Sequence, residues 1–366
     1  MKLNKINQNF IDKIFENILN NNISNGIVIA SPSKKDPNYF YHWTRDSALV
    51  MKNVAKYYKE TGNLQAFKQI IDYIEIETHH QNTETLTGLG EPKFNVKKDN
   101  SAFNELWGRP QNDSPALRGL TMLFIYDIFD DYKCLKDNIK KILDKDLEYL
   151  IDNIDKETYD LWEEIKGFHL FTTCVQYKFI KEYKIRFNNN NYNLQNSLDT
   201  LRNNLNKHSI INNSFNSHGN INRLYDSSLF LCLNAINYDL DIINIFNEKF
   251  KNYVLEIVDF FKNEYSINKN NKFIFIGRYK DDKYYGGHPW IITTTSFLQL
   301  LIYYSKNDVI LLENQEKMIL EYINYILKFD NLDISEQIDK NTGTQLSAKN
   351  LTWNYSELYS MWDMLV

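Results

Sequence analysis

The sequence predicts an all-helical fold. Glycine and proline are scarce, with 12 and 6 among 366 residues, and the apolar residues between them recur mostly at three- and four-residue spacing. KFIFIGRY at 272–279 is the one stretch with a convincing strand alternation, so we expect a short strand or β-hairpin near 272–285. A chain of this length fits either one large domain or two ordinary ones.

Helical periodicity and stop signals divide the chain into twelve predicted helices. In order, they cover residues 5–21, 45–62, 63–81, 112–133, 136–154, 167–183, 190–208, 225–236, 242–265, 289–305, 311–330 and 350–362. The loops richest in Gly, Pro and Trp precede the second, fourth, sixth, tenth and twelfth segments, whereas most odd-numbered segments follow short, bland turns. Short connections favour antiparallel packing of consecutive helices. We therefore expect the loops rich in Gly, Pro and Trp to meet on one face of the protein.

Tryptophan is concentrated in these rich loops. Five of the six tryptophans lie in or beside them, namely Trp43, Trp107, Trp162, Trp290 and Trp353. Aromatic rings around a polar pocket suit sugar binding, because the C–H face of a pyranose stacks on a ring while its hydroxyls take hydrogen bonds. Core packing explains any single Trp equally well, but five in such loops favour a sugar site.

Charge and chain pattern argue against several partners. The net charge is −5 and the 42 basic residues are dispersed, so we expect neither a nucleic acid nor an anionic membrane as a partner. At the N-terminus, apolar and polar residues alternate at helical spacing, without the apolar run of a signal peptide. No segment is apolar enough to span a membrane. We therefore expect a cytoplasmic protein and a monomer.

Cysteine and histidine give no sign of a metal site. Cys134, Cys174 and Cys232 are odd in number and far apart, without the close pairing of zinc or redox motifs. The His79–His80 pair has no acidic or Cys partner at ligand spacing, so we interpret it as a helix end. No metal is expected, and disulfides do not define the fold.

Two motifs carry glutamates that could act as catalysts. In YDLWEE at 159–164, Trp162 offers an apolar wall that disfavours the ionised form of Glu163, as a general acid requires, and Glu164 would repel it. Paired glutamates on a helix are, however, more often a solvated face. Glu336 in SEQ at 335–337 is the second candidate, although a lone glutamate is normally structural.

Three further motifs supply arginines and an aspartate. YHWTRDS holds Arg45 and Asp46 before a predicted helix, GRPQND holds Arg109, and GRY holds Arg278. Taken singly, Asp46 is explained as a helix cap or a first-turn dipole partner, and the arginines as salt-bridge partners.

Together, these motifs resemble the glucoamylase family, glycoside hydrolase family 15, along nearly the whole chain and in the same order. The matching segments are GIVIASPSKKDPNYFYHWTRDSALV, GLGEPKF, WGRPQNDSPALR, YDLWEE, GRYKDDKYYGGHPW and SEQIDKNTGTQLSAKNLTWNYS. The resemblance implies an all-α (α/α)6 barrel of six inner and six outer helices, with the active site at the N-terminal ends of the inner helices. It also implies that residues 1–366 form a single catalytic domain without a separate starch-binding domain.

The resemblance further implies roles for individual residues. Glu163 matches the family's general acid, which must be protonated, and Glu336 its general base, which must be ionised. The positions expected to contact substrate are Tyr39, Arg45, Asp46, Trp107, Asp160, Glu164, Arg278, Trp290 and Trp353. The implied reaction is exo-acting, inverting release of β-D-glucose from the non-reducing ends of α-1,4-glucans such as starch, glycogen and maltooligosaccharides, without a cofactor.

The chain also departs from the family pattern. His288 stands where Asn is more usual and Asn350 where Asp is common, while Phe168 and His169 replace small polar residues beside the expected acid. We interpret His169 and His288 as packing or surface residues. Cleavage of α-1,6-glucan or trehalose, a catalytically silent glucan-sensing role and a purely structural helical scaffold remain alternatives.

Overall fold

Twelve α-helices dominate the computed structural model, which describes residues 8–23, 25–97, 99–189, 192–208, 213–217, 219–221 and 223–365. They are α1 (Gln8–Asn20), α2 (Thr44–Thr61), α3 (Leu64–His80), α4 (Asp113–Ile128), α5 (Lys133–Asn153), α6 (Leu170–Arg186), α7 (Tyr192–Lys207), α8 (Ser228–Ala235), α9 (Glu248–Glu264), α10 (Ile291–Lys306), α11 (Gln315–Ile326) and α12 (Thr352–Asp363). Each corresponds to one predicted helix. Residues 5–7 and 190–191, which the prediction also assigned to helices, lie outside the described residues.

Eight short strands accompany the helices in the described residues. They are β1 (Tyr41–Trp43), β2 (Lys93–Asn95), β3 (Thr158–Tyr159), β4 (Lys166–His169), β5 (Ser214–Asn216), β6 (Gly219–Asn220), β7 (Gln337–Ile338) and β8 (Gln345–Leu346). They form antiparallel sheets in the orders β1-β2, β3-β4-β5-β6 and β7-β8. None of these strands was predicted from the sequence, because segments of two to four residues carry too little alternation to be recognised.

The predicted strand at 272–279 is wrong, since this segment is an irregular loop with no strand pairing. Its backbone groups bond to side chains instead of to a neighbouring strand. The amide of Asn268 accepts from the N–H of Phe275 at 2.9 Å and donates to its carbonyl at 3.0 Å, while Thr294 accepts from the N–H of Ile276 at 3.0 Å. The apolar alternation therefore reflects a buried loop, and the 3-10 turn η3 (Tyr284–Gly286) occupies the end of the expected hairpin.

Backbone contacts divide the described residues into two units that alternate along the chain. The middle unit contains Asn21–Ala30 and the segment from Phe40 through β6. The terminal unit contains α1, Ser31–Tyr39 and the segment from Arg223 onward.

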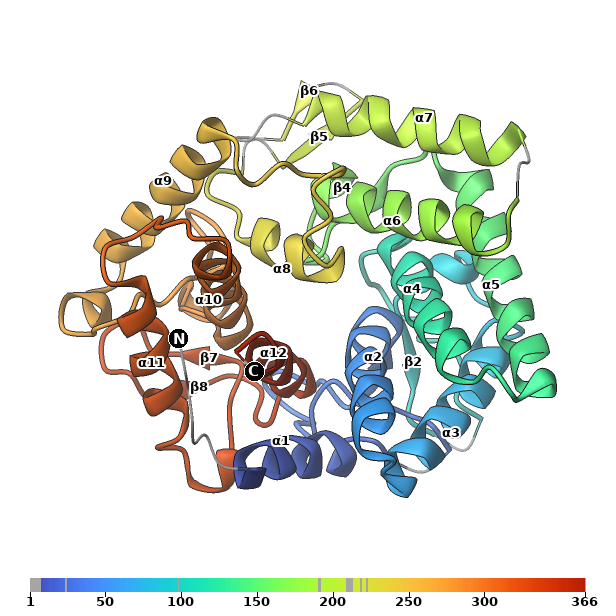
Figure 1. Ribbon diagram of the computed structural model, residues 1–366, viewed down its shortest axis with the longest axis horizontal. Coiled ribbons are helices and arrows are strands. Elements are labelled where there is room, and N and C mark those ends of the chain that lie inside the picture. The colour runs from blue at the N-terminus through green and yellow to red at the C-terminus, as the bar shows by residue number, and fades with distance from the viewer. Residues whose placement is uncertain are drawn as a thin grey trace. The chain divides into compact units, whose positions relative to one another are not determined.

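The middle unit is built from helix pairs. Helices α2, α4 and α6 pack side by side in that order, and α3, α5 and α7 each pack against the even-numbered helix before them (Figure 1). Eleven of the 16 residues of α4 are buried, against six of the 21 residues of α5. The even-numbered helix is thus enclosed on most sides, whereas its partner buries one apolar stripe.

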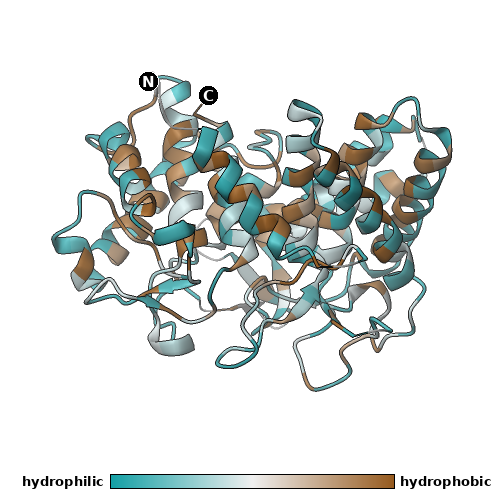
Figure 2. Cartoon of the chain, turned by 90° about the horizontal axis from the view of Figure 1, so that it is seen from below, coloured by the Kyte–Doolittle hydropathy of each residue, from teal (hydrophilic) through white to brown (hydrophobic). Residues whose placement is uncertain are grey.

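The terminal unit repeats this pattern. Helix α10 packs against α8, α11 and α12, and α1 packs against α12 (Figure 1). Thirteen of the 16 residues of α10 are buried, against five of the 12 residues of α11. Figure 2 shows hydrophobic and hydrophilic residues alternating along the helices, as expected where many helices bury only one face.

The motif-rich loops lead directly into the even-numbered helices. Helix α2 begins after Trp43, α6 after His169 and α10 after Trp290. The sequence-based expectation that motif-rich loops precede alternate helices is therefore confirmed. Within the described residues, no helix is both long and apolar enough to cross a membrane.

Candidate active site

Glu163 lies at the tip of a tight turn between β3 and β4 in the middle unit. Its φ of 65° places it in the left-handed region, which a non-glycine residue adopts at a cost. The carboxylate of Asp160 holds the turn, because Oδ1 accepts the backbone N–H groups of Glu164 and Ile165, each at 2.8 Å. The backbone N–H of Glu163 itself donates to the carbonyl of Asp160 at 2.9 Å. A strained position that its surroundings enforce is typical of a functional residue.

Three N–H donors converge on the carboxylate of Glu163. Oε1 accepts from the indole of Trp43 at 2.9 Å and from the guanidinium of Arg45 at 2.7 Å. Oε2 accepts from the indole of Trp107 at 2.6 Å. Each carboxylate oxygen has two lone pairs, so Oε1 is saturated while Oε2 keeps one lone pair free to carry a proton.

Arg45 joins Glu163 to a second acidic group. Its Nη1 donates to Asp113 Oδ2 at 3.0 Å and to Gln111 at 2.9 Å, and its Nε lies 3.6 Å from Asp46 Oδ2. Burial raises the pKa of Asp46 to about 7, although the Arg45 charge opposes the shift. One guanidinium therefore serves three carboxylates, which leaves Asp46 readily protonated near neutral pH.

Sequence reasoning missed Gln111 and Asp113 and singled out Arg109 from the same motif. Arg109 donates instead to Glu91 at 3.0 Å and to the carbonyl of Phe103 at 2.7 Å. It thus ties the loop that carries Trp107 to the loop before β2. The signal for Asp113 was its place in the first turn of a predicted helix, which we did not distinguish from ordinary capping.

Glu336 lies in the terminal unit, immediately before β7. Its backbone N–H donates to Ala348 at 2.8 Å, and its carbonyl accepts from Ile291, the first residue of α10, at 3.1 Å. Ser347 Oγ donates to its Oε2 at 2.5 Å, and Gln337 donates to the same oxygen at 3.2 Å. The side chain is therefore fixed by the β7–β8 hairpin and by the start of α10.

Burial governs the charge of Glu336. It raises the pKa of this carboxyl to about 7, while hydrogen bonds from Ser347 and Tyr39 and the charge of Arg278 oppose the shift. Glu336 is thus only partly ionised at neutral pH. This differs from the sequence-based expectation of a base that stays ionised, because the burial of a single glutamate cannot be inferred from local sequence.

Tyr39 and Arg278 surround Glu336 in the terminal unit. The hydroxyls of Tyr39 and Tyr284 share a hydrogen bond of 2.7 Å, and burial raises the pKa of Tyr39. Arg278 makes two bonds to Asp282, at 2.9 and 2.6 Å. Its guanidinium carbon lies 5.3 Å from the ring centroid of Trp290, so three expected substrate-binding residues lie close together here.

The remaining site candidates differ in their surroundings. The indole of Trp353 donates to buried Glu357 at 2.9 Å, so its polar edge is engaged within α12. Glu164 is exposed beside Glu163. Both oxygens of Asp160 accept backbone N–H groups of the Glu163 turn, so this residue shapes the turn.

Two of the departures from the family pattern, His169 and His288, make packing contacts. His169 Nε2 donates to the carbonyl of Thr158 at 3.1 Å, and in the neutral ring its Nδ1 accepts from the hydroxyl of Ser214 at 2.7 Å, which joins β4 to its neighbours. His288 Nδ1 accepts the backbone N–H of Lys340 at 3.0 Å. The interpretation of both histidines as packing residues is confirmed.

His42, Glu77 and His80 form a buried cluster whose potential ligand atoms all lie within 4.8 Å of one another. Glu77, three residues before His80, is an acidic partner that the sequence analysis overlooked. His42 Nδ1 accepts the N–H of Val28 at 3.1 Å, so in the neutral ring Nε2 carries the proton and donates to Glu77 at 2.8 Å. Arg118 donates to the other Glu77 oxygen at 2.9 Å. His42 and Glu77 therefore form a hydrogen-bonded core pair, whereas both ring nitrogens of His80 are buried without a hydrogen-bond partner among the described residues and its ring stacks on Phe94.

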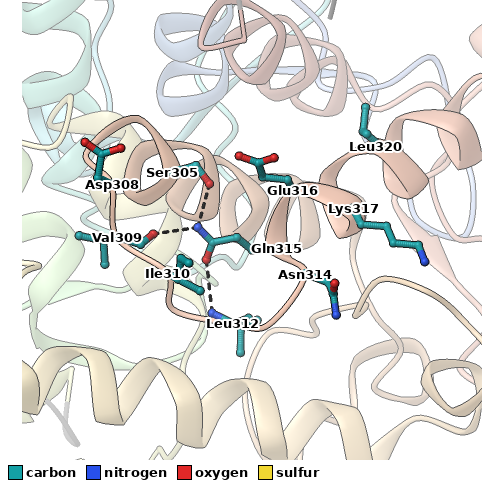
Figure 3. Close-up of a pocket in the computed structure, with 10 residues that line it drawn as sticks. All are labelled: Ser305, Asp308, Val309, Ile310, Leu312, Asn314, Gln315, Glu316, Lys317 and Leu320. Atoms are coloured by element: carbon teal, nitrogen blue, oxygen red, sulfur yellow. Dashed lines mark hydrogen bonds between the residues drawn. The ribbon is translucent and has the colours of Figure 1, made fainter. Parts of the chain in front are cut away.

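A pocket of about 600 Å³ lies at the turn between α10 and α11 (Figure 3). Its buried amide, Gln315, accepts from the N–H of Leu311 and donates to Val309 and Ser305 at 2.8–2.9 Å. No candidate site residue lines this pocket. Because Gln315, the buried polar side chain of its lining, is used within the turn, the pocket offers a ligand no buried free polar group.

Comparison with known proteins gives a consistent family. Residues 8–362 match the profile described as Glycosyl hydrolases family 15. The chain is 28% identical to the intracellular, sporulation-specific glucoamylase of Saccharomyces cerevisiae, over 96% of this chain and 81% of that protein. It is 30% identical to Glucoamylase S2 of the same yeast, over 80% of this chain but only 44% of that protein.

The solved structures agree with the sequence comparisons. The glucoamylase of Hormoconis resinae superposes with a TM-score of 0.85 at 25% identity, covering 98% of this chain and 73% of that one. Glucoamylases of this family are (α/α)6 barrels, so the predicted fold class is confirmed. The chain belongs to glycosyl hydrolase family 15, the family of the glucoamylases.

Proposed function

We propose that this chain is a glucoamylase that releases β-D-glucose from the non-reducing ends of α-1,4-glucans by single displacement. The observation that carries the proposal is the setting of Glu163, held in a left-handed turn with its carboxylate between two indoles and a guanidinium. A carboxyl positioned this firmly suits proton transfer to a glycosidic oxygen. Family membership and the names of the relatives support the same activity.

Glu163 is the proposed general acid, and Oε2 is the oxygen that carries its proton. Oε1 already accepts two N–H groups, whereas Oε2 accepts only that of Trp107. When the proton leaves for the glycosidic oxygen, the charge that develops on the carboxylate is met by Arg45 and both indoles. These donors therefore strengthen most in the transition state, which is where binding lowers the barrier.

Glu336 is the proposed general base, which removes a proton from the attacking water. An inverting pair needs space for this water, so the two carboxyl groups of such enzymes lie roughly 6.5–9.5 Å apart. With its pKa near 7, Glu336 is a stronger base than an ordinary carboxylate, although its ionised fraction falls below neutral pH.

The proposed substrate is a glucan chain end. Arg45, Asp46 and Arg278 are the polar groups proposed to bind the hydroxyls of the terminal glucose, with Trp290 as an apolar wall. Recognition of hydroxyls that only a terminal glucose leaves free would make the attack exo-acting. Glu164, exposed beside the acid, is proposed to contact the sugar next to the scissile bond.

We further propose that the chain acts as a single catalytic domain, as a monomer and in the cytoplasm. Interleaving of the two units along the chain supports a single domain, because neither unit is one continuous stretch. Cys134, Cys174 and Cys232 form no disulfide, which suits a reducing compartment, and one relative is named as intracellular. Light scattering of the purified chain measures its mass in solution. A mass other than that of one copy would refute the proposed monomer.

A substrate panel tests the proposed function. The purified chain is incubated with maltotriose, isomaltotriose, trehalose and a maltoheptaose blocked at its non-reducing end, and free glucose is measured over time. Fastest release from maltotriose and none from the blocked chain is the expected result. Preference for isomaltotriose or trehalose would move the specificity to the α-1,6 or trehalose alternative, and no turnover by folded protein would favour the silent glucan-sensing role.

A further inference from the structure

Lys93 is a buried lysine whose neighbours are aromatic. It lies in β2, directly opposite Trp43 of β1, and only 1% of its surface is exposed. None of the described acidic residues forms an ion pair with it. Its ammonium instead lies 3.2 Å from the ring centroid of Trp107, 4.1 Å from Phe103, 4.5 Å from Trp43 and 4.6 Å from Tyr41.

The four rings form a closed cage. Tyr41 contacts Trp43 and Phe103 edge to face, with centroids 5.7 and 5.2 Å apart. Trp107 closes the circuit with centroid distances of 6.3 Å to Trp43 and 5.9 Å to Phe103. The negative ring faces attract a cation, and this attraction is stronger where water is excluded. The ammonium thereby holds the rings at fixed positions.

Two rings of this cage are also the indoles that clamp Glu163. Trp43 donates to Oε1 and Trp107 to Oε2, at 2.9 and 2.6 Å. The indole ring of Trp43 therefore lies between the Lys93 ammonium and Oε1 of Glu163, and the indole ring of Trp107 lies between the ammonium and Oε2. A cation over an indole face draws electron density from the ring, which makes the indole N–H a stronger donor.

We propose that Lys93 is a positioning residue for Glu163, which keeps the clamp of Trp43 and Trp107 in place and makes Glu163 a stronger acid. The positive charge favours the carboxylate that forms when the proton leaves. Because the ammonium is enclosed by rings, it stabilises this charge without binding the carboxylate directly. The inference rests on the proposed role of Glu163 as the general acid.

The charges around Lys93 are consistent with a cation at neutral pH. Burial lowers its pKa to about 8, and Glu163, Glu105 and Glu91 oppose this shift, whereas Arg109 adds to it. Among these three carboxylates, Glu163 has the largest effect on the pKa of Lys93. Arg45, the direct partner of Glu163, supplies the other positive charge facing the same carboxylate.

The experiment compares Lys93→Met, which keeps an unbranched apolar chain in the cage, with Lys93→Arg, which keeps a charge. Lys136→Met is the matched control, because Lys136 of α5 lies 4.1 Å over the ring of Tyr126 of α4 and pairs with Asp130 away from the Glu163 turn. Each variant is assayed with maltotriose and with α-glucosyl fluoride. Fluoride leaves with little help from an acid, so its release reports on the rest of the site.

We expect Lys93→Met to lower kcat on maltotriose by roughly tenfold or more with little change in KM, and to spare α-glucosyl fluoride hydrolysis. The alkaline limb of its maltotriose profile should move to higher pH, because a weaker acid keeps its proton longer. Lys93→Arg should retain more activity than Lys93→Met, and Lys136→Met should match the parent chain. Normal maltotriose turnover by Lys93→Met, or an equal loss on both substrates, would overturn the proposal.

An assay-independent measurement separates this proposal from the proposed function. The indole N–H resonances of Trp43 and Trp107 are recorded by NMR in the parent chain, in Lys93→Met and in Lys136→Met. A selective shift of these two resonances in Lys93→Met is expected even if the parent chain fails to cleave any tested glucan. Unchanged resonances in Lys93→Met would refute the role of Lys93, whatever the activity.

Discussion

Trp107 donates its indole N–H to Oε2 of Glu163 at 2.6 Å, and among the described residues it is the only hydrogen-bond partner of that oxygen. The same indole covers the ammonium of Lys93. One side chain thus connects a buried cation to the oxygen that we propose carries the acid proton. Substitutions around this contact should alter turnover far more than stability.

Trp107→Phe tests the contact itself. Phenylalanine keeps an aromatic ring beside Lys93 but removes the N–H, so the carboxylate formed in the transition state loses one donor. We expect kcat to fall by about tenfold to hundredfold with a smaller change in KM. Steady-state kinetics on maltotriose measure this, with Trp362→Phe, which packs against Phe10, as the control. An equal loss of kcat in Trp107→Phe and Trp362→Phe would argue against a catalytic role for the contact.

Asp160→Ala tests the support of the Glu163 turn. Without its carboxylate, the N–H groups of Trp162, Glu164 and Ile165 lose their acceptor, and the left-handed Glu163 loses what enforces its geometry. We expect a loss of about 1–3 kcal/mol in unfolding free energy and a disproportionate loss of kcat. Urea unfolding and kinetics measure both, and Asp155→Ala on the exposed segment nearby should change neither. Full activity in Asp160→Ala would contradict the role of the turn.

Glu336→Gln tests the electrostatics of the proposed base. An ordinary glutamate has a pKa near 4.3 in an unfolded chain, whereas burial raises that of folded Glu336 to about 7. The folded state binds the proton more tightly, so stability from this group falls as pH rises between these values. Above pH 7 the cost reaches roughly 4 kcal/mol, which Gln removes.

We therefore expect Glu336→Gln to be inactive yet more stable than the parent at pH 8, with the difference vanishing near pH 4. Thermal unfolding across this pH range measures it, and Glu313→Gln on the surface serves as the control. A variant less stable than the parent at pH 8 would contradict the raised pKa. In the parent chain, activity should fall on acidification through about pH 7, because protonated Glu336 cannot accept a proton from water.

Arg118→Met tests the buried network beneath the site. Arg118 pairs with Glu77 at 2.9 Å and with Asp146 at 2.5 Å, and all three side chains are buried. Removing the guanidinium leaves two buried carboxylates without their cation, so we expect a loss of about 3–5 kcal/mol in urea unfolding. Arg186→Met removes the more exposed pair with Asp127 and should cost less than about 1 kcal/mol. Similar losses of unfolding free energy in Arg118→Met and Arg186→Met would contradict a stabilising role for the buried network.

Helix order and the placement of the motifs could be predicted from the sequence because they depend on local pattern. Apolar periodicity marked each helix, and the loops before α2, α6 and α10 stood out by their Trp, Gly and Pro content. Glu163 and Glu336 acquired distinct roles only from the family resemblance, since isolated glutamates carry no chemical signature.

Other features depend on contacts that local sequence does not encode. Phe275 alternates like a strand residue, yet Asn268 satisfies its backbone. Glu77 and His80 lie three positions apart, but only the fold brings His42 to them. Lys93 resembles a surface lysine in sequence, and its aromatic cage is assembled from β1 and the loop after β2. Burial of Glu336 likewise follows from the β7–β8 hairpin, which is too short to predict.

The most direct test of Glu163 as the acid of an inverting enzyme is proton NMR of maltotriose hydrolysis, followed from the first minutes in the parent chain and in Glu163→Gln. The account predicts that the parent releases β-glucose first, with the α anomer appearing only by mutarotation. Glu163→Gln should retain the fold and lose turnover by at least about a hundredfold. Initial release of α-glucose, or near-normal turnover by Glu163→Gln, would contradict it.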